Sequence, residues 1–229
     1  NIQKEQEQLL VKELKEATGL PSAASFKHVS PAGAAVYVAL NDVEKQMYFV
    51  DDVELTPMAS AYIRARGSDR MSSYGDFAAL SDECDAACAK YLSKEVSDGV
   101  IAPSFSKEAL AILKKKKNLR ILKLKNLDAR DAKYDIKYLE GKVLVQELNT
   151  KMIDEMKVVT AAKPTPEQLT DMEFGMKVVK YVTSNAICIV KNGVKLAIGG
   201  GQTSRVWALE HAIRNNPDNE FKDSVLASD

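Results

Sequence analysis

Lys27 and His28 lie side by side in the stretch Ser-Phe-Lys-His-Val-Ser-Pro, where an apolar run gives way to a Pro-Gly turn. The pattern predicts a strand that ends here and presents both side chains to a cleft. Imidazole titrates near neutral pH, so His28 can take up and return a proton. The neighbouring ammonium of Lys27 can stabilise a developing oxyanion. The alternative is a surface Lys-His pair without a role, because proximity in sequence alone proves little.

Two further segments combine acidic side chains with glycine. Residues 64–76 hold three arginines, two aspartates and Gly75, and a glycine lets the backbone approach a ligand closely. A structural cluster of salt bridges is the competing interpretation of this segment. Residues 95–99 precede an apolar run. Asp98 within them can bind a ligand amine or a ribose hydroxyl, or it can simply form an Asp-Gly turn.

The last third of the chain supplies amide and anion-binding groups. Asn185 leads into an apolar run, and its side chain can both donate and accept hydrogen bonds. Three glycines at 199–201 separate a predicted strand from a predicted helix. Backbone amides at a helix N-terminus, together with the guanidinium of Arg205, favour a phosphate or a carboxylate. The spacing matches neither the dinucleotide-binding fingerprint nor the P-loop.

Composition limits the classes of function. The chain has 229 residues, of which 45% are hydrophobic and 28% are charged, enough for one large α/β domain or two small ones. Basic and acidic residues are equal at 32 each, so no bulk charge favours nucleic acid. No apolar run reaches the roughly 18 residues of a membrane span, and no signal peptide is visible. We expect a reduced, cytoplasmic protein that binds neither nucleic acid nor membrane.

Three cysteines occur in the chain, at 84, 88 and 188. The four-residue spacing of Cys84 and Cys88 suits one helix face. We interpret them as free thiols rather than as a metal pair, because no histidine or third cysteine lies close by in sequence. The sequence therefore predicts no metal site.

Helical and extended patterns alternate along the chain, which indicates α/β layers. Asn192-Gly193 is a strong hairpin signal, so the sheet should be mixed rather than purely parallel. Polar residues 125–142 indicate a surface excursion or a boundary. Lysines 114–117 suit a solvated helix end more than a phosphate site. We predict helices at 3–17, 57–66, 85–94, 107–116, 166–182 and 204–214, and strands at 22–28, 99–103, 119–124, 143–147, 186–191 and 195–198. Residues 77–80 form a short apolar run.

Taken in order, these segments resemble the transformylase domain of the AICAR transformylase/IMP cyclohydrolase family. The matching stretches lie at residues 25–35, 64–76, 95–103, 184–185 and 200–206. The resemblance covers nearly the whole chain and is weakest across 118–140. It implies cytidine-deaminase-like, three-layer α/β subdomains with mixed sheets. We expect residues 1–124, with the Lys-His motif, to form the first subdomain, and residues 125–229 to form a second that is incomplete at its C-terminus.

The resemblance implies transfer of a formyl group from 10-formyltetrahydrofolate to the aromatic amine of AICAR, which gives the formamido nucleotide FAICAR. In this interpretation His28 matches the family's proton acceptor, and Lys27 matches the lysine that stabilises the transition state. The zinc signature of true deaminases, H-x-E with P-C-x-x-C, is absent, which disfavours zinc deamination. The positions that match ligand contacts of the family are Gly75, Asp98, Asn185 and Arg205 for AICAR, and Val206 for the folate.

Parts of the family pattern are missing. The cyclohydrolase domain, an early phosphate-gripping segment and a C-terminal aromatic stretch do not appear, so we expect a fragment or a stand-alone transformylase without cyclohydrolase activity. The resemblance also implies a homodimer with its sites near the interface, and a potassium ion that no residue here places. The alternative function is a non-catalytic nucleotide-binding core.

Overall fold

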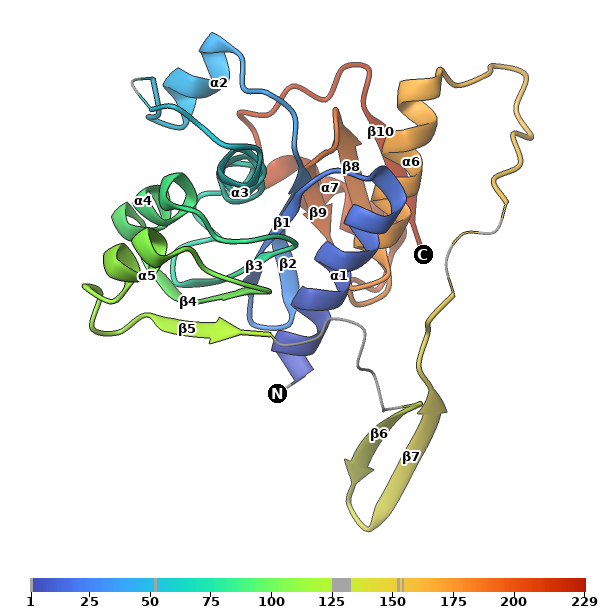
Figure 1. Cartoon of the computed structure of the whole chain (residues 1–229). Coiled ribbons are helices and arrows are strands. Elements are labelled where there is room, and N and C mark those ends of the chain that lie inside the picture. The colour runs from blue at the N-terminus through green and yellow to red at the C-terminus, as the bar shows by residue number, and fades with distance from the viewer. Residues whose placement is uncertain (1, 52, 125–132, 152, 154) are drawn as a thin grey trace.

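The computed structural model describes residues 2–51, 53–124, 133–151, 153 and 155–229. Within these residues eight strands form one sheet in the order β10-β8-β9-β2-β1-β3-β4-β5, while β6 and β7 pair separately (Figure 1). The strands are β1 (Ser22–Lys27), β2 (Ser30–Val36), β3 (Asp76–Leu80), β4 (Ser97–Ala102), β5 (Arg120–Lys123), β6 (Tyr134–Leu139), β7 (Lys142–Glu147), β8 (Ile187–Lys191), β9 (Val194–Gly199) and β10 (Val225–Ser228). The helices are α1 (Ile2–Thr18), α2 (Asp42–Met47), α3 (Pro57–Gly67), α4 (Ala86–Lys94), α5 (Lys107–Leu113), α6 (Pro166–Val179) and α7 (Arg205–Arg214).

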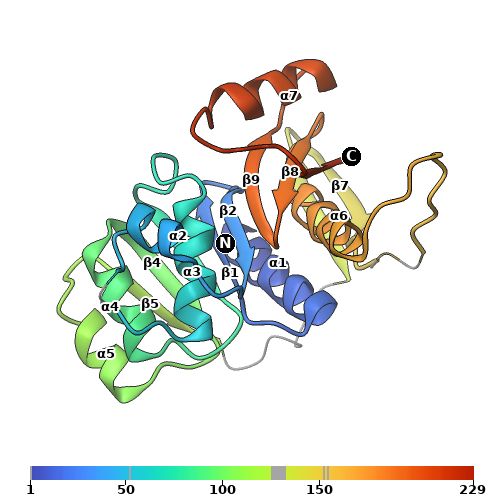
Figure 2. The ribbon, with the colours of Figure 1, turned by 90° about the horizontal axis from the view of Figure 1, so that it is seen from above.

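Helices cover both faces of the sheet, as the view from above shows (Figure 2). Neighbouring residues of a strand point to opposite faces. On β8, Cys188 packs in one apolar cluster with Phe174 of α6 and with residues of α1. The adjacent Ile187 packs instead with Ala208 of α7. Residues of α3, α4 and α5 form another cluster against the sheet. The predicted α/β class with a mixed, layered sheet is confirmed.

A narrow contact joins β2 to β9 and so completes the sheet. Ala35 pairs with Val194, and the Val36 amide donates to the Gly193 carbonyl at 2.9 Å. Strands from before residue 124 and strands from after residue 125 therefore share one hydrogen-bonded sheet. The division into subdomains 1–124 and 125–229 stays a prediction.

The predicted Asn192-Gly193 hairpin turn is confirmed, and buried charges hold it from two helices. Arg64 of α3, which is 2% exposed, donates to the Val36 carbonyl at 3.0 Å and to the Asn192 carbonyl at 2.7 Å. Asp171 of α6 accepts from the Asn192 amide at 2.8 Å and from the Gly193 amide at 2.7 Å. The turn is thus fixed on the side of α3 and on the side of α6.

The predicted Pro-Gly turn after His28 is wrong, because Pro31 and Gly33 lie within β2. His28 itself forms the turn, with a positive φ of 57°, a conformation in which histidine is enriched among non-glycine residues. Gly33 is needed instead because α3 packs closely against β2 at this position. A Cβ atom there would lie 1.8 Å from the Ala65 carbonyl oxygen of α3, so only glycine lets that helix lie so close to the strand.

Besides β2, the elements α2 and β6 escaped prediction. The short helix α2 begins with a capping box, in which Asn41 and Glu44 satisfy each other's backbone amides. Strand β6 pairs with β7 along its whole length, in the region 125–142 that was expected to be a surface excursion or a boundary. Residues 125–132 of that excursion lie outside the described residues.

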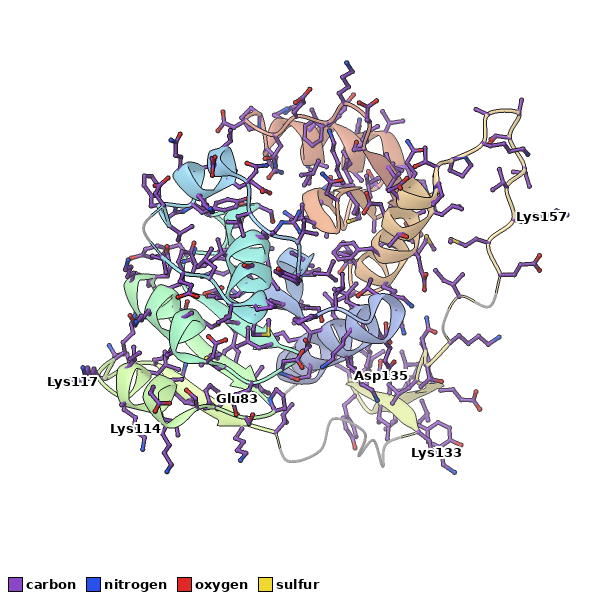
Figure 3. All side chains as sticks on the ribbon, turned by 45° about the horizontal axis from the view of Figure 1, so that its top comes forward. Glu83, Lys114, Lys117, Lys133, Asp135 and Lys157 are labelled. Carbon is purple, nitrogen blue, oxygen red and sulfur yellow. The ribbon has the colours of Figure 1, made fainter. Side chains whose placement is uncertain are left out.

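The lysine run after α5 is mainly solvent-exposed, as expected. Lys114, Lys115 and Lys117 are exposed, and Figure 3 shows the side chains of Lys114 and Lys117 pointing away from the body of the protein. Lys116 differs, since its ammonium donates to the carbonyls of Ser93 and Glu95 at the end of α4. Cations suit that end of a helix because of the helix dipole.

The three cysteines are free and buried, which confirms their interpretation as free thiols. In the described part of the chain, no group of three or more His, Cys, Asp and Glu side chains is arranged to hold a metal ion. No helix among those residues has the length and apolar character needed to cross a membrane.

Lys195 of β9 is fully buried. Among the described residues its ammonium nitrogen has no hydrogen-bond partner. Burial lowers its pKa below the ordinary value of 10.5, and interactions with Asp69 and Cys188 act in the opposite direction. The folded state therefore binds this proton less tightly than the unfolded state does. Protonation of Lys195 therefore lowers the free energy of unfolding. This loss is absent well above pH 10.5 and grows as the pH falls from 10.5 toward the lowered pKa.

We expect Lys195→Met to raise the free energy of unfolding at pH 7 by about 1–3 kcal/mol, because it removes a buried polar group without a partner. The gain should narrow at pH 10.5, where the lysine has lost its proton in about half of the unfolded molecules and in more than half of the folded ones. Urea denaturation at the two pH values measures the difference. Lys90→Met, at an exposed position of α4, is the control and should change little. A Lys195→Met protein less stable than the parent at pH 7 would contradict this account.

Candidate functional site

The strand directions place the candidate site residues at one edge of the sheet. β1 is antiparallel to β2 and β3, β4 is parallel to β3, and β9 is antiparallel to β2 and β8. β1 and β9 therefore end at the same edge at which β3, β4 and β8 begin. We call this edge the Lys27 edge. It carries Lys27, Gly75 and Asp98 from one half of the chain, and Asn185 and Arg205 from the other.

Lys27, Gly75 and Asp98 come together. The Lys27 ammonium donates to the Tyr74 carbonyl at 2.6 Å and to the Gly75 carbonyl at 3.2 Å. Gly75 has a positive φ of 72°, and a Cβ atom on it would lie 2.9 Å from Lys27 Nζ and 3.9 Å from Asp98 Oδ1. A side chain at position 75 would therefore crowd the Lys27 ammonium, while the predicted approach of a ligand to this glycine stays a prediction. An ammonium and a carboxylate flank an open stretch of backbone, which suits a polar ligand.

His28 follows Lys27 in the tight turn between β1 and β2, and it is exposed. The turn makes Lys27 the last residue of its strand, with the imidazole one residue beyond it. An exposed imidazole beside an anchored ammonium can reach a ligand lying on the Lys27 edge. The predicted pairing of a proton acceptor with a cation stays compatible with this geometry.

Two of the three arginines of segment 64–76, Arg66 and Arg70, form a salt-bridge cluster, which was the competing interpretation. Arg66 pairs with Glu95 at 3.3 Å, and Arg70 pairs with the same carboxylate at 3.1 Å. Arg66 also donates to the Val96 carbonyl at 3.2 Å, and that carbonyl accepts from the Gly75 amide at 2.9 Å. The cluster thus fixes the loop that ends at Gly75, so its contribution to the site is structural support.

Asn185 and Arg205 form a second group beyond β9. The side-chain amide of Asn185 donates to the Gln202 carbonyl at 2.8 Å. Arg205 donates to Ser228 Oγ at 3.2 Å and to the Asp229 carbonyl at 2.9 Å, and its guanidinium lies 3.8 Å from the Asp229 carboxylate. The Arg205 guanidinium, which was predicted to bind an anion, is therefore already paired with the Asp229 carboxylate. A bound anion would have to replace that carboxylate.

The first turn of α7 is open to solvent. Ser204, the N-cap residue, makes no side-chain hydrogen bond to the helix, so backbone amides there remain available. Val206 is 62% exposed, and Trp207 beside it is 54% exposed. Trp207 is the one tryptophan of the chain. Its position two residues after Arg205 was not singled out from the sequence, although an aromatic residue at a glycine-rich helix start was a visible signal.

A pocket of about 450 Å³ lies where β2 and β9 separate at the Lys27 edge. Lys27, Ser30 and Asp69 line it from one half of the chain, and Ile198, Asn215 and Asn216 line it from the other. Lys27 is therefore part of a concave surface. Gly75 with Asp98, and Asn185 with Arg205, flank the edge outside its lining. Asn215 and Asn216 were missed from the sequence, because the Asn-Asn-Pro that ends α7 is indistinguishable from an ordinary turn.

These features define an α/β protein with a polar site at the strand ends of one sheet edge, assembled from both halves of the chain. A family model described as AICARFT/IMPCHase bienzyme matches residues 5–215. The chain belongs to this family, as the order of its motifs predicted.

Proteins named bifunctional purine biosynthesis protein PurH are similar over most of the chain. The one from Clostridioides difficile (strain 630) is 48% identical over 169 residues, 74% of this chain and 33% of that protein. The one from Thermoanaerobacter sp. (strain X514) is 41% identical over 222 residues, 96% of this chain and 39% of that protein. The chain thus spans between 33% and 39% of the length of these relatives.

We expect Gly75→Ala to displace the Lys27 ammonium from the Tyr74 and Gly75 carbonyls, because the new Cβ atom would lie 2.9 Å from it. The reaction of Lys27 with acetic anhydride, followed by peptide mass spectrometry, should then become faster. Gly141→Ala is the matched control: Gly141 also has a φ of 72°, but nothing lies within 4 Å of its Cβ position. Both changes should cost about 1 kcal/mol of backbone strain. Equal Lys27 labelling in both proteins would refute the contact.

Proposed function

We propose that this chain carries the formyl-transfer site of a purine biosynthesis enzyme. The formyl group passes from 10-formyltetrahydrofolate, the folate cosubstrate, to the aromatic amine of AICAR and gives FAICAR. Membership of the family and the similarity to PurH proteins support a role in purine biosynthesis. The observation that carries the finer proposal is the anchored Lys27 ammonium beside His28, with Asp98 close to the same glycine.

The chemistry requires a proton acceptor and a cation. The amine of AICAR is a weak nucleophile because its lone pair is delocalised into the ring and the carboxamide. As its nitrogen forms a bond to the formyl carbon, His28 takes the departing proton. The formyl oxygen becomes an oxyanion, which Lys27 stabilises. Collapse of this tetrahedral intermediate breaks the bond from carbon to the folate nitrogen, and that nitrogen takes up a proton.

The remaining site residues would hold the ligands. We propose that Gly75, Asp98, Asn185 and Arg205 bind AICAR and that Val206 contacts the folate. The backbone at Gly75 allows close approach, and Asp98 accepts from ligand N–H or O–H groups. Arg205 would exchange its Asp229 partner for an anionic group of the ligand, since both are carboxylate-like acceptors for a guanidinium fork.

Other parts of the proposal rest on the family resemblance alone. They are a cytoplasmic location and a potassium ion, for which this chain offers no assigned position. A second candidate function is nucleotide binding without turnover. The open first turn of α7 and the exposed guanidinium of Arg205 favour it, since they could bind an anionic ligand without taking part in a reaction.

The β6–β7 hairpin supports the proposal of a homodimer. It extends away from the body of the protein (Figure 1), and Figure 3 labels Asp135 on its first strand and Lys133 directly before that strand. Apolar side chains on it are exposed, with Tyr138 at 81% and Val145 at 59%. An isolated two-stranded hairpin is marginally stable in water. A second copy of the chain would cover these side chains, and sites near that interface would follow the family pattern.

Turnover tests the proposed function directly. With AICAR and 10-formyltetrahydrofolate supplied, the chain should produce FAICAR, and His28→Ala should lower kcat by about 10²- to 10⁴-fold while AICAR affinity changes little. The fluorescence of Trp207 reports that affinity independently. His211→Ala removes the other histidine, on α7, and should retain activity. AICAR binding without any turnover would favour the nucleotide-binding alternative.

Sedimentation tests the dimer. At micromolar concentration the chain should sediment at twice its mass of 25.2 kDa. Tyr138→Lys together with Val145→Lys should shift it to monomer, because lysine at both positions makes burial of the hairpin costly. A parent chain that is monomeric under these conditions would contradict the proposal.

A further inference from the structure

A small polar cluster lies buried beneath the Lys27 edge. Asp76 accepts from Ser25 Oγ at 2.7 Å through one carboxylate oxygen and from Ser97 Oγ at 2.5 Å through the other. Ser25 Oγ also lies 2.8 Å from Ser73 Oγ. Ser25, Ser73 and Asp76 are fully buried, and Ser97 is nearly so. We call these four residues the Asp76 cluster.

Each member of the cluster lies within two positions of a site residue in the sequence, Ser73 two positions before Gly75. Ser25 precedes Lys27 by two positions on β1, so both side chains point to the same face of the sheet. Asp76 directly follows Gly75, and Ser97 directly precedes Asp98. Through its two oxygens, Asp76 therefore connects β1 and β4 across β3, just below the point where Lys27, Gly75 and Asp98 meet.

The carboxylate is costly to bury. Desolvation raises the pKa of Asp76, while the hydrogen bonds from Ser97 and Ser25 and the charge of Arg66 lower it, and the charge of Glu95 raises it. Apolar side chains of similar size would hold the three strands together without that cost. What a satisfied polar network adds is a defined geometry, because each hydrogen bond fixes both distance and direction. The strand ends that need such geometry are those that carry Lys27 and Asp98.

We infer that Asp76 is a positioning residue of the formyl-transfer site, which fixes Lys27 relative to Asp98 by accepting hydrogen bonds from Ser25 and Ser97. The inference rests on the proposed function. Asp76 is fully buried, so it acts through the residues above it and does not touch a ligand. Positioning groups of this kind matter because a displacement of about 1 Å can lower a rate about 10²-fold.

Two serines of β1 allow a matched test. Ser25→Ala removes the bond to Asp76, whereas Ser22→Ala removes an equally buried hydroxyl, which donates to the Val11 carbonyl at 2.6 Å at the opposite end of the strand. Both variants should show similar shifts of the urea midpoint. Ser25→Ala alone should lower kcat/KM for formyl transfer, by about tenfold or more, with the larger share in kcat because Lys27 acts mainly in the transition state. Asp76→Asn should lower kcat/KM further, again with the larger share of the loss in kcat.

A second readout separates the inference from the proposed function. Acetic anhydride should label Lys27 faster in Ser25→Ala than in Ser22→Ala, because only the first variant loosens the end of β1. This measurement needs no turnover. If the parent chain shows no formyl transfer but Lys27 is labelled faster in Ser25→Ala than in Ser22→Ala, the proposed function is wrong and the positioning role of Asp76 is retained. Equal labelling and equal kinetics in the two serine variants would overturn the inference, even where Asp76→Asn fails to fold.

Discussion

A short contact between β2 and β9 is the constraint on which the candidate site depends. One ladder pair, Ala35 with Val194, and one further hydrogen bond, from Val36 to Gly193, join the two groups of strands. Two buried charges, Arg64 and Asp171, hold the adjacent turn. Without this contact, Lys27 and Arg205 would belong to two separate sheets joined only through packing such as that of α1 against α6. With it, the two groups share one edge.

The same contact explains why a pocket opens at the other end of this seam. β2 and β9 pair only near their far ends, so Ser30 and Ile198 line a space of about 450 Å³ instead of pairing. A continuous ladder would have stabilised the sheet more and left no concave surface beside Lys27. Two charged side chains, Arg64 and Lys195, are buried near this contact. Burial disfavours their charged forms and so lowers the pKa of each. The protein thus buries charged groups near the contact between β2 and β9 and leaves the Lys27 edge open.

Local signals in the sequence predicted most of the elements, and nonlocal contacts explain the misses. Thr56-Pro57 and Thr165-Pro166 begin α3 and α6 as their capping chemistry indicates. The order of the motifs predicted the family and the residues Lys27, Gly75 and Asp98 that the fold brings together. β2 was missed because Gly33 is explained only by the approach of α3, which no local pattern contains. The Asp76 cluster was missed for a similar reason, since Ser25 lies 48 positions before Ser73 and 51 positions before Asp76 in the chain.

The site combines rigid and replaceable contacts in a way that suits transfer chemistry. On the side of Lys27, the ammonium is bound by backbone carbonyls, and the strands beneath it are tied by the Asp76 cluster, so the cation needs little reorganisation when an oxyanion forms. On the side of Arg205, the guanidinium is exposed and pairs with a side chain that a ligand can displace. Preorganisation is most effective where charge develops in the transition state, whereas exchangeable pairing is sufficient where a ligand only binds. The distribution of burial along the Lys27 edge therefore separates the groups expected to act on the reaction from those expected to hold its substrate.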